Sequence, residues 1–224
     1  MSTFQRARSE EQREARRRAI LDTAAAMLDE MPVSAVSLNE LSRRVGLAKS
    51  NVLRYFESRE AILLELLDHA WKQWTAALPE PLSVGVDASA PAGVRGEQFA
   101  AVITASLAEG RVLCDLLSAQ AGVLEHNVSP QVAARYKRAA IANVDELAAL
   151  VRTHLPELGD GASQLAASML MVIGAVWTHA RPSQAMLAAY EADPALAVLK
   201  MDFATSLQGL LATLAAGTLA RTRS

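Results

Sequence analysis

The chain has 224 residues, of which 51% are hydrophobic and 21% are charged, and its formal net charge is −2. This composition is apolar enough to bury a core and excludes global disorder, while the length allows one large or two small domains. The single cysteine, Cys114, excludes an internal disulfide and fits a reducing, cytoplasmic environment. The N-terminal sequence "MSTFQRARSEEQREARRR" is too charged for a signal peptide.

The charges are unevenly distributed along the chain. Residues 1–59 hold 11 Lys or Arg against 8 Asp or Glu, a net charge of +3, whereas residues 60–224 hold 11 against 16, a net charge of −5. A basic front end on an acidic body predicts a polyanionic partner for the front end alone. A basic tail that is merely solvated is the alternative.

Alanine and leucine, which favour helices, are abundant, and no alternating β-branched run indicates a strand, so we predict an all-α fold. The first helix is expected over residues 11–31, because Ile20, Ala24 and Met27 recur on one helical face. Pro32 should end this helix, since proline lacks the backbone N–H that continues the hydrogen-bond ladder.

A pair of short helices is expected next. Ser37 is a good N-cap, and Glu40 three residues later completes a capping box for a helix over residues 38–45. Gly46 should end that helix, because glycine adopts the left-handed conformation at low cost. With a second short helix over residues 49–56, the segment has the helix-turn-helix layout.

Longer helices are predicted for the rest of the chain. One should begin after the cap Ser58 and end before Pro79, with a buried stripe that includes Trp71 and Trp74. Residues 79–93 contain three prolines and two glycines, which predict a loop. Further helices are expected near residues 94–109, 111–125 and 130–155, followed by a break at 156–161.

Two later segments, residues 161–180 and 203–220, contain no charged residue. Their serines, threonines and glutamines make them poor membrane spans. A helix on the surface of a single subunit normally has a charged face, so we predict a homodimer with a four-helix interface built from the helices near 161–180 and 199–220. Two core helices buried within a monomer are the alternative.

Side chains on the outside of the helix-turn-helix suit DNA. Lysine and arginine donate to guanine O6 and N7, asparagine pairs with adenine, and hydroxyl groups donate to phosphate oxygens. A small packing motif with ordinary surface cations is the alternative. The outward side chains, together with the cap and the first turn of the next helix, are Ser37, Lys49, Ser50, Asn51, Arg54, Tyr55 and Arg59.

The sequence "AILDTAAAMLDEMPVSAVSLNELSRRVGLAKSNVLRYFESREAILLELL" (19–67) resembles the DNA-binding domain of the TetR/AcrR-like family of transcriptional regulators. The resemblance is close over residues 10–70. It implies an N-terminal three-helix DNA-binding domain with a basic arm, residues 1–60, and a C-terminal helical bundle for ligand binding and dimerisation, residues 61–224. The arginines of the arm, which we expect to follow the adjacent DNA backbone or minor groove, are Arg6, Arg8, Arg13, Arg16, Arg17 and Arg18.

The resemblance also implies roles for single residues. Those that match positions near bases are Asn39, Lys49, Ser50, Asn51 and Arg54, and those that match phosphate contacts are Ser37, Tyr55 and Arg59. Many members have tyrosine where this chain has Leu53, so we expect Leu53 only to pack.

Catalytic and metal sites are not indicated. The four histidines fall on different predicted elements without metal-ligand spacing, and there is no phosphate loop or nucleophile motif. We therefore expect no enzymatic activity, no metal and no cofactor.

A regulator released by an effector needs a cavity in its C-terminal bundle. Few charges fall in the candidate lining, which favours a small hydrophobic effector. Candidate lining residues, any of which can instead be simple core, are Trp74, Cys114, Leu117, Leu124, His126, Tyr136, Asn143, Met169, Met171, Ile173 and Trp177. We expect a repressor that binds a palindromic operator as a homodimer; a regulator without an effector, or an activator, is the alternative.

Overall fold

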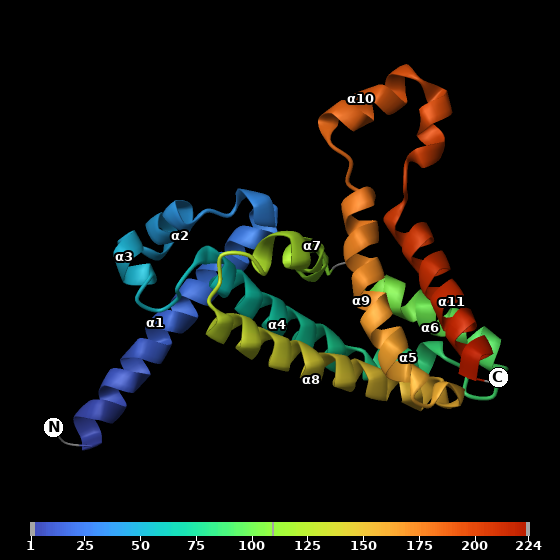
Figure 1. The fold of residues 1–224 in the computed structure, drawn as a ribbon, viewed down its shortest axis with the longest axis horizontal. Coiled ribbons are helices and arrows are strands. Elements are labelled where there is room, and N and C mark those ends of the chain that lie inside the picture. The colour runs from blue at the N-terminus through green and yellow to red at the C-terminus, as the bar shows by residue number, and fades with distance from the viewer. Residues whose placement is uncertain (1–2, 109, 223–224) are drawn as a thin grey trace. The chain divides into compact units, whose positions relative to one another are not determined.

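The computed structural model describes residues 3–108 and 110–222, with side chains described from residue 10 onward. Within these ranges the chain forms helices and no strand, which confirms the all-α prediction (Figure 1). The chain divides into two compact units. One contains the residues up to Leu67 together with Ala119–Tyr136, and the other contains Asp68–Ser118 together with the residues from Lys137 onward. The functional boundary near residue 60 stays a prediction.

The first unit opens with α1 (Thr3–Glu30), which begins eight residues earlier than the apolar pattern predicts. That prediction placed the start at residue 11, nine residues before the apolar stripe begins at Ile20. Half of residues 3–10 are Arg, Gln or Glu, whose straight side chains lose little freedom in a helix, which favours the earlier start. After Pro32, a single 3₁₀ turn, η1 (Val33–Ala35), leads to the next helix.

The helix-turn-helix consists of α2 (Leu38–Val45) and α3 (Lys49–Val52). The second helix is shorter than the predicted 49–56. Its last turn tightens instead: the N–H of Arg54 donates to the carbonyl of Asn51 at 3.2 Å, and the N–H of Tyr55 donates to that of Val52 at 3.0 Å. Bonds of this i to i+3 type are common where an α-helix ends.

A small core closes this unit. Ile20, Ala24 and Met27 of α1 are fully buried, as predicted, and Val52 and Phe56 from the second half of the helix-turn-helix are buried as well. Each such large apolar side chain contributes about 1.5–3 kcal/mol when it is fully buried. Phe56 is thus buried in the core even though α3 ends four residues before it.

The returning segment 119–136 also belongs to this unit. It contains η2, a π-helical stretch (Gln120–Leu124), and the start of α8 (Pro130–His154). The carboxylate of Glu57 accepts a hydrogen bond from the backbone N–H of Ser129 at 2.5 Å. The predicted helix 111–125 is thus α7 (Arg111–Ala119) followed by a π-helix.

The second unit is a bundle that begins in the long helix α4 (Arg59–Ala77). The predicted loop 79–93 is wrong in its first half, because α5 (Pro79–Gly85) is helical. Pro79 stands in the first turn of α5, where a missing N–H costs no hydrogen bond. The bundle continues with α6 (Ala92–Ser106), α9 (Gly161–His179) and α11 (Phe203–Thr222). The last two correspond to the two predicted uncharged segments, and Arg221 is the only Lys, Arg, Asp or Glu in either helix.

Contacts of α11 with α6 and α9 hold this bundle together. An added Cβ on Gly96 of α6 would lie 3.4 Å from the Cβ of Ala215 on α11, so the two helices approach closely there. The buried side chain of Arg95 links the first turn of α6 to the end of α8. It donates to the carbonyl of His154, the last residue of α8, at 2.9 Å, and it forms an ion pair with Glu157 just after that helix.

A segment between α9 and α11 was not predicted. It contains α10 (Gln184–Ala192) and η4 (Pro194–Leu199), and none of the residues in these two elements is buried. In Figure 1 it stands beyond the ends of α9 and α11. Its exposed hydrophobic residues include Val198 and Leu199, which are 84% and 69% accessible.

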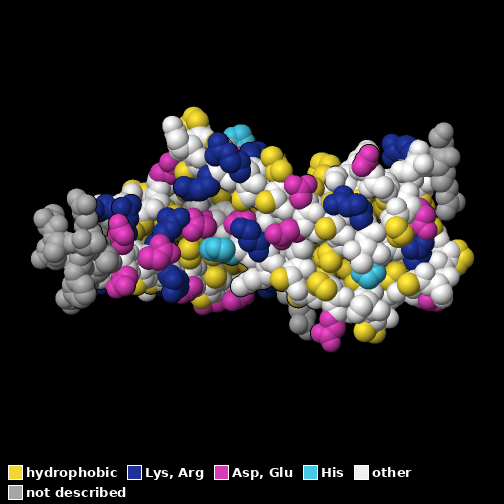
Figure 2. Space-filling model, turned by 90° about the horizontal axis from the view of Figure 1, so that it is seen from below, with side chains coloured by type: hydrophobic (Ala, Val, Ile, Leu, Met, Phe, Trp, Pro, Cys, Tyr) yellow, Lys and Arg dark blue, Asp and Glu magenta, His cyan; other side chains and the backbone are white. Residues whose placement is uncertain are grey.

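By length and composition alone, α9 and α11 could each cross a bilayer, a test that core helices of soluble proteins also pass. Within the chain their apolar windows are only 44% and 28% buried. Hydrophobic side chains also reach the surface elsewhere, as Figure 2 shows in yellow for one face. A single subunit therefore leaves most of α11 uncovered.

Candidate nucleic-acid interface

The ends of α2 fix the geometry of the helix-turn-helix, as the sequence predicts. The Oγ of Ser37 accepts a hydrogen bond from the N–H of Glu40 at 3.1 Å. At the other end Gly46 has φ 69° and ψ 30°, the left-handed conformation that glycine adopts at low cost. The N–H of Leu47 then donates to the carbonyl of Ser42 at 3.0 Å and closes the turn that leads to α3.

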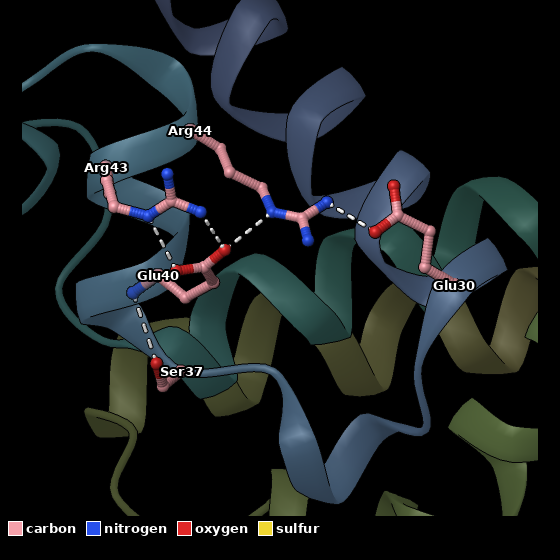
Figure 3. A network of polar contacts seen from close by, with 5 residues as sticks. All are labelled: Glu30, Ser37, Glu40, Arg43 and Arg44. Carbon is pink, nitrogen blue, oxygen red and sulfur yellow. Dashed lines mark hydrogen bonds and ion pairs between the residues drawn. The ribbon is translucent and has the colours of Figure 1, made fainter.

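The other half of the predicted capping box is replaced by a network of charges (Figure 3). The carboxylate of Glu40 accepts from Arg43 at 2.6 and 2.9 Å and from Arg44 at 2.8 Å. Arg44 also pairs with Glu30 of α1 at 2.7 Å. Two of the four cations between residues 41 and 56 are therefore paired with carboxylates of the same chain, at its surface. The signal was present in the sequence, since Glu40 precedes them by three and four residues.

This network gives Glu40 an unusually low pKa. Hydrogen bonds from Arg43 first and Arg44 second lower the pKa of its carboxyl from 4.5 to about 2. Because the folded-state pKa lies below the unfolded one, the network's contribution is complete above pH 4.5 and is lost as the pH falls to about 2. In urea unfolding between pH 5 and pH 2, we expect the stability difference between wild type and Glu40→Gln to shrink over this window. The exposed variant Ser34→Ala, which removes no ionisable group, should show no such trend.

The predicted base-reading residues lie on the exposed side of the helix-turn-helix. Lys49, Ser50 and Asn51 form the first turn of α3. Asn39, in the first turn of α2, and Arg54, in the turn after α3, are exposed as well. Among the described residues, none of these five side chains has a hydrogen-bond or ion-pair partner. Their donors and acceptors are thus available to a partner molecule.

The three predicted phosphate contacts are arranged differently. The hydroxyl of Ser37 accepts the capping bond but keeps its own hydrogen to donate. Tyr55 is half-buried, and its backbone carbonyl accepts from Arg17 at 3.1 Å. Arg59 is engaged, since it donates to the carbonyl of Val36 at 2.9 Å and pairs with Glu60 at 3.1 Å. Its contact with phosphate stays a prediction.

We expected Leu53 only to pack against the protein, but the structure does not bear this out. Its side chain is 40% exposed, in the turn that follows α3. An apolar side chain among DNA-reading groups can contact the methyl group of thymine.

Candidates for an effector site fall into both units. His126, Leu124 and Tyr136 belong to the unit of the helix-turn-helix, and the remaining candidates belong to the bundle. Met171 is 69% exposed, so its assignment to an interior lining is wrong.

Within the bundle, the structure brings candidates on α7 and α9 together. An added Cβ on Gly174 would lie 3.1 Å from the carbonyl oxygen of Leu117, and the Nε1 of Trp177 donates to Asp115 at 3.3 Å. Cys114 of α7 and Met169 and Ile173 of α9 are buried. These candidates therefore share one side of the bundle.

Trp74 and Asn143 have partners of their own. The Nε1 of Trp74 donates to Ser106 at 2.9 Å, and the Nδ2 of Asn143 donates to Asp68 at 2.8 Å. The Oδ1 of Asn143 is buried without a hydrogen-bond partner in the described part of the chain, and so are the Nε1 of Trp71 and the hydroxyl of Thr75. Trp71 and Thr75 were not predicted as site residues, because Trp71 was assigned to the buried stripe of α4 and nothing in the sequence singled out Thr75.

The thiol of Cys114 is predicted to be inert in the folded protein. Burial, reinforced by the neighbouring Asp115, raises its pKa from 9.0 to about 12, so almost no thiolate forms at pH 8. Ellman's reagent should label the native protein far more slowly than the guanidinium-unfolded chain. Fast labelling of the native protein would show that α7 opens readily.

In the described part of the chain, no three His, Cys, Asp or Glu side chains gather into a site for a metal ion. The arrangement is one of exposed hydrogen-bonding groups on and beside a short helix, which can bind a partner molecule.

Comparisons with known proteins identify the family of this chain. Residues 20–66 match the model for bacterial regulatory proteins of the tetR family, and residues 68–222, more than half of the chain, match the tetracyclin repressor-like C-terminal domain. The HTH-type transcriptional regulator EthR of Mycobacterium tuberculosis is 38% identical over 60 residues, and EthR of Mycobacterium bovis matches equally. That alignment spans 27% of this chain and only 28% of EthR.

Solved structures of the same family align over most of the chain. The regulator PfmR from Thermus thermophilus aligns with a TM-score of 0.48 and 18% identity, over 88% of this chain and 97% of that one. A regulator described as a putative tetR family member from a Shewanella species aligns with a TM-score of 0.48 and 14% identity, over 88% and 96%. On the strength of the two family models, this chain belongs to the TetR family of transcriptional regulators.

Proposed function

We propose that this protein is a cytoplasmic repressor that binds a palindromic operator as a homodimer and is released by a small, mostly hydrophobic effector. The main observation in favour of DNA binding is that the cations of the helix-turn-helix region fall into two groups. Arg43, Arg44 and Arg59 are paired with carboxylates of the same chain, whereas Lys49 and Arg54 are exposed and have no such partner among the described residues. Lys49 lies on the short helix α3 two residues before Asn51, and Arg54 lies in the turn three residues after it.

The chemistry of these groups fits the edges of base pairs in a major groove. Lys49 and Arg54 offer donors to guanine O6 and N7, and the amide of Asn51 offers a donor and an acceptor to adenine. The hydroxyls of Ser37 and Tyr55 offer donors to phosphate oxygens, which fix register but do not read sequence. Asn39 and Ser50 complete the base-facing set that we propose.

The dimer is supported by an uncharged exposed stripe on α9. Gln164, Ser168, Met171 and Ala175 recur at i, i+4, i+7 and i+11, the spacing of one helical face, and none of them is buried. The neighbouring helix α11 is mostly uncovered and carries no charge before Arg221. Two copies of this face packed about a two-fold axis form a four-helix interface.

Two-fold symmetry has a direct consequence for the operator. Each subunit presents one α3, so the proposed site is a palindrome whose half-sites lie about one helical turn of DNA, or a multiple of it, apart. An effector releases DNA if it binds the DNA-free arrangement more tightly, and DNA must then weaken effector binding by the same factor.

Buried polar atoms in the bundle support an effector site. The Nε1 of Trp71, the hydroxyl of Thr75 and the Oδ1 of Asn143 lack partners among the described residues. Trp71 and Thr75 lie three and seven residues after Asp68, to which Asn143 is bonded, so all three atoms belong to one side of α4. A buried polar group without a partner costs about 1–3 kcal/mol, which a ligand with a neutral donor and acceptor would recover.

Selection of random duplex DNA by the purified protein, at about 0.15 M salt, tests the central claim. Enrichment of a palindrome establishes sequence-specific dimeric binding and supplies a probe for effector screening. A folded dimer that enriches no sequence, also after partial unfolding and refolding to remove a bound effector, contradicts the proposed function.

A further inference from the structure

We propose that the α10–η4 segment (residues 184–199) packs against the partner subunit and adds a second contact surface to the homodimer. The inference rests on the proposed dimer but concerns a surface outside its four-helix interface. The segment joins α9 to α11 and stands beyond the ends of these helices (Figure 1). The surface that we expect to cover it belongs to a second copy of this chain.

The composition of the segment is that of a buried element. Its only charged or amide side chains are Gln184, Glu191 and Asp193, and the remainder are Ala, Met, Leu, Tyr, Pro and Val. Nevertheless none of its helical residues is buried, and Val198 is 84% exposed. Large apolar patches on soluble proteins mark interaction sites. The segment therefore needs a cover that the described residues of one subunit do not provide.

The segment is a folded element and not a loose loop. The Oγ of Ser183 accepts a hydrogen bond from the N–H of Met186 at 3.3 Å and caps α10. The carboxylate of Asp193 accepts from the N–H of Ala195 at 3.0 Å and caps η4. The two helices also pack against each other. Their apolar side chains thus have defined positions, as a docking surface requires.

Aromatic contacts fasten the base of the segment. The ring of Trp177 on α9 meets the ring of Phe203 on α11 edge to face, with centroids 5.2 Å apart. The guanidinium of Arg181 lies 4.5 Å from the centroid of the Trp177 ring. These contacts hold the end of α9 against the start of α11, so the segment projects from them as one unit.

The proposed dimer face leads up to this segment, which favours a second copy of the chain as its cover. Thr178 follows Met171 and Ala175 by seven and three residues, so it continues the exposed stripe of α9 to the last turn before the segment. On the other side, α11 begins with the exposed residues Ala204 and Thr205. A two-fold interface uses the same patch on both subunits, so a surface that adjoins the patch lies next to the partner.

The size of the segment fits this contact. The helix α10 has nine residues and is therefore about 13 Å long. The axes of packed helices lie about 8–10 Å apart. An element of this length that projects next to the dimer face is long enough to reach the helices of the partner.

The charges near the segment disfavour a lipid membrane as its cover. Helices that lie in a membrane surface are rich in lysine and arginine on their polar face. The segment and its connection to α11 hold three acids, Glu191, Asp193 and Asp202, against one lysine, Lys200. Anionic headgroups would be repelled, whereas an uncharged protein surface matches the apolar side chains.

The first test finds the neighbours of the segment by photo-cross-linking. Val198→Cys is labelled with a benzophenone maleimide, and Val84→Cys on α5, where Val84 is 85% exposed, is the matched control. Cys114 is buried and does not compete for the label. Isotopically light and heavy forms of each variant are mixed, left to exchange subunits and irradiated. We expect cross-linked peptides of mixed isotope, which arise only between subunits, from position 198 and not from position 84.

The second test measures the contribution of the segment to the dimer. Val198→Asp/Leu199→Asp places two carboxylates at positions that are exposed in the subunit, so folding should be retained, as circular dichroism checks. The dimer dissociation constant, measured by sedimentation over a dilution series, should rise by about tenfold or more, because each carboxylate would be buried without a partner. Val84→Asp should dimerise like wild type.

The remaining outcomes separate the two hypotheses. If wild type is monomeric, the proposed dimer itself fails. If wild type is dimeric but position 198 gives no mixed-isotope cross-links, or no more than position 84, the segment does not contact the partner, while the four-helix interface stands. If vesicles of phosphatidylcholine and phosphatidylglycerol bind wild type but not Val198→Asp/Leu199→Asp, the segment docks on a membrane and the inference is wrong.

Discussion

Met171→Glu is expected to convert the dimer into monomers and to abolish operator binding at concentrations that saturate with wild type. Met171 is 69% exposed at the centre of the uncharged stripe on α9. At the proposed interface the substitution introduces a carboxylate from each subunit into a stripe whose residues carry no charge. Burying an unpaired charge costs about 3–5 kcal/mol, which is more than a hundredfold in the dimer dissociation constant. Light scattering after size exclusion measures the mass directly.

The matched control for this substitution is Ile141→Glu. Ile141 is 63% exposed on α8, so the same charge enters an equally accessible apolar position outside the stripe. It should remain dimeric. Val176 would be a poor probe although it lies on the same helix, because it is buried within the subunit and a glutamate there would disturb folding. A dimeric Met171→Glu protein would place the interface on another surface.

Asn51→Ala is expected to weaken operator binding strongly and to relax the preference for one base pair in each half-site. A bidentate contact between asparagine and adenine contributes about 1–3 kcal/mol, and a symmetric dimer loses it twice. The loss should therefore reach about 2–6 kcal/mol, or roughly 30-fold to 10⁴-fold in affinity. Fluorescence anisotropy with the selected operator gives the affinity, and a repeated selection gives the preference.

Ser34→Ala serves as the neutral control, since Ser34 is exposed in η1 and its substitution removes a polar group from the same unit. It should bind like wild type. Unchanged affinity and unchanged preference in Asn51→Ala would show that α3 does not present its first turn to the bases.

Local chemistry made much of this interface predictable from the sequence. The Ser37 cap, the Gly46 turn and the buried face of Ile20, Ala24 and Met27 each depend on residues only a few positions apart. Capping, left-handed glycine and helical periodicity operate over that range. The helices near 161–180 and 199–220 could also be predicted, because their lack of charged residues is a property of a short continuous segment.

Features that depend on distant partners were not predictable. Arg59 reaches the carbonyl of Val36, 23 residues away, and Arg44 reaches Glu30 on another helix. The helices α10 and η4 were not predicted from the sequence. None of their residues is buried, so the segment lacks the apolar periodicity that marks a packed helix.

The returning segment Ala119–Tyr136 limits how the DNA-binding part can be exchanged between relatives. The chain passes from one compact unit to the other after residues 67, 118 and 136, so no single break separates them. A chimaera that joins a foreign N-terminal sequence at residue 68 would keep this segment but replace its docking surface, including Glu57, which accepts from the N–H of Ser129. Successful grafts should therefore retain a matching acceptor at position 57 or transplant both segments together.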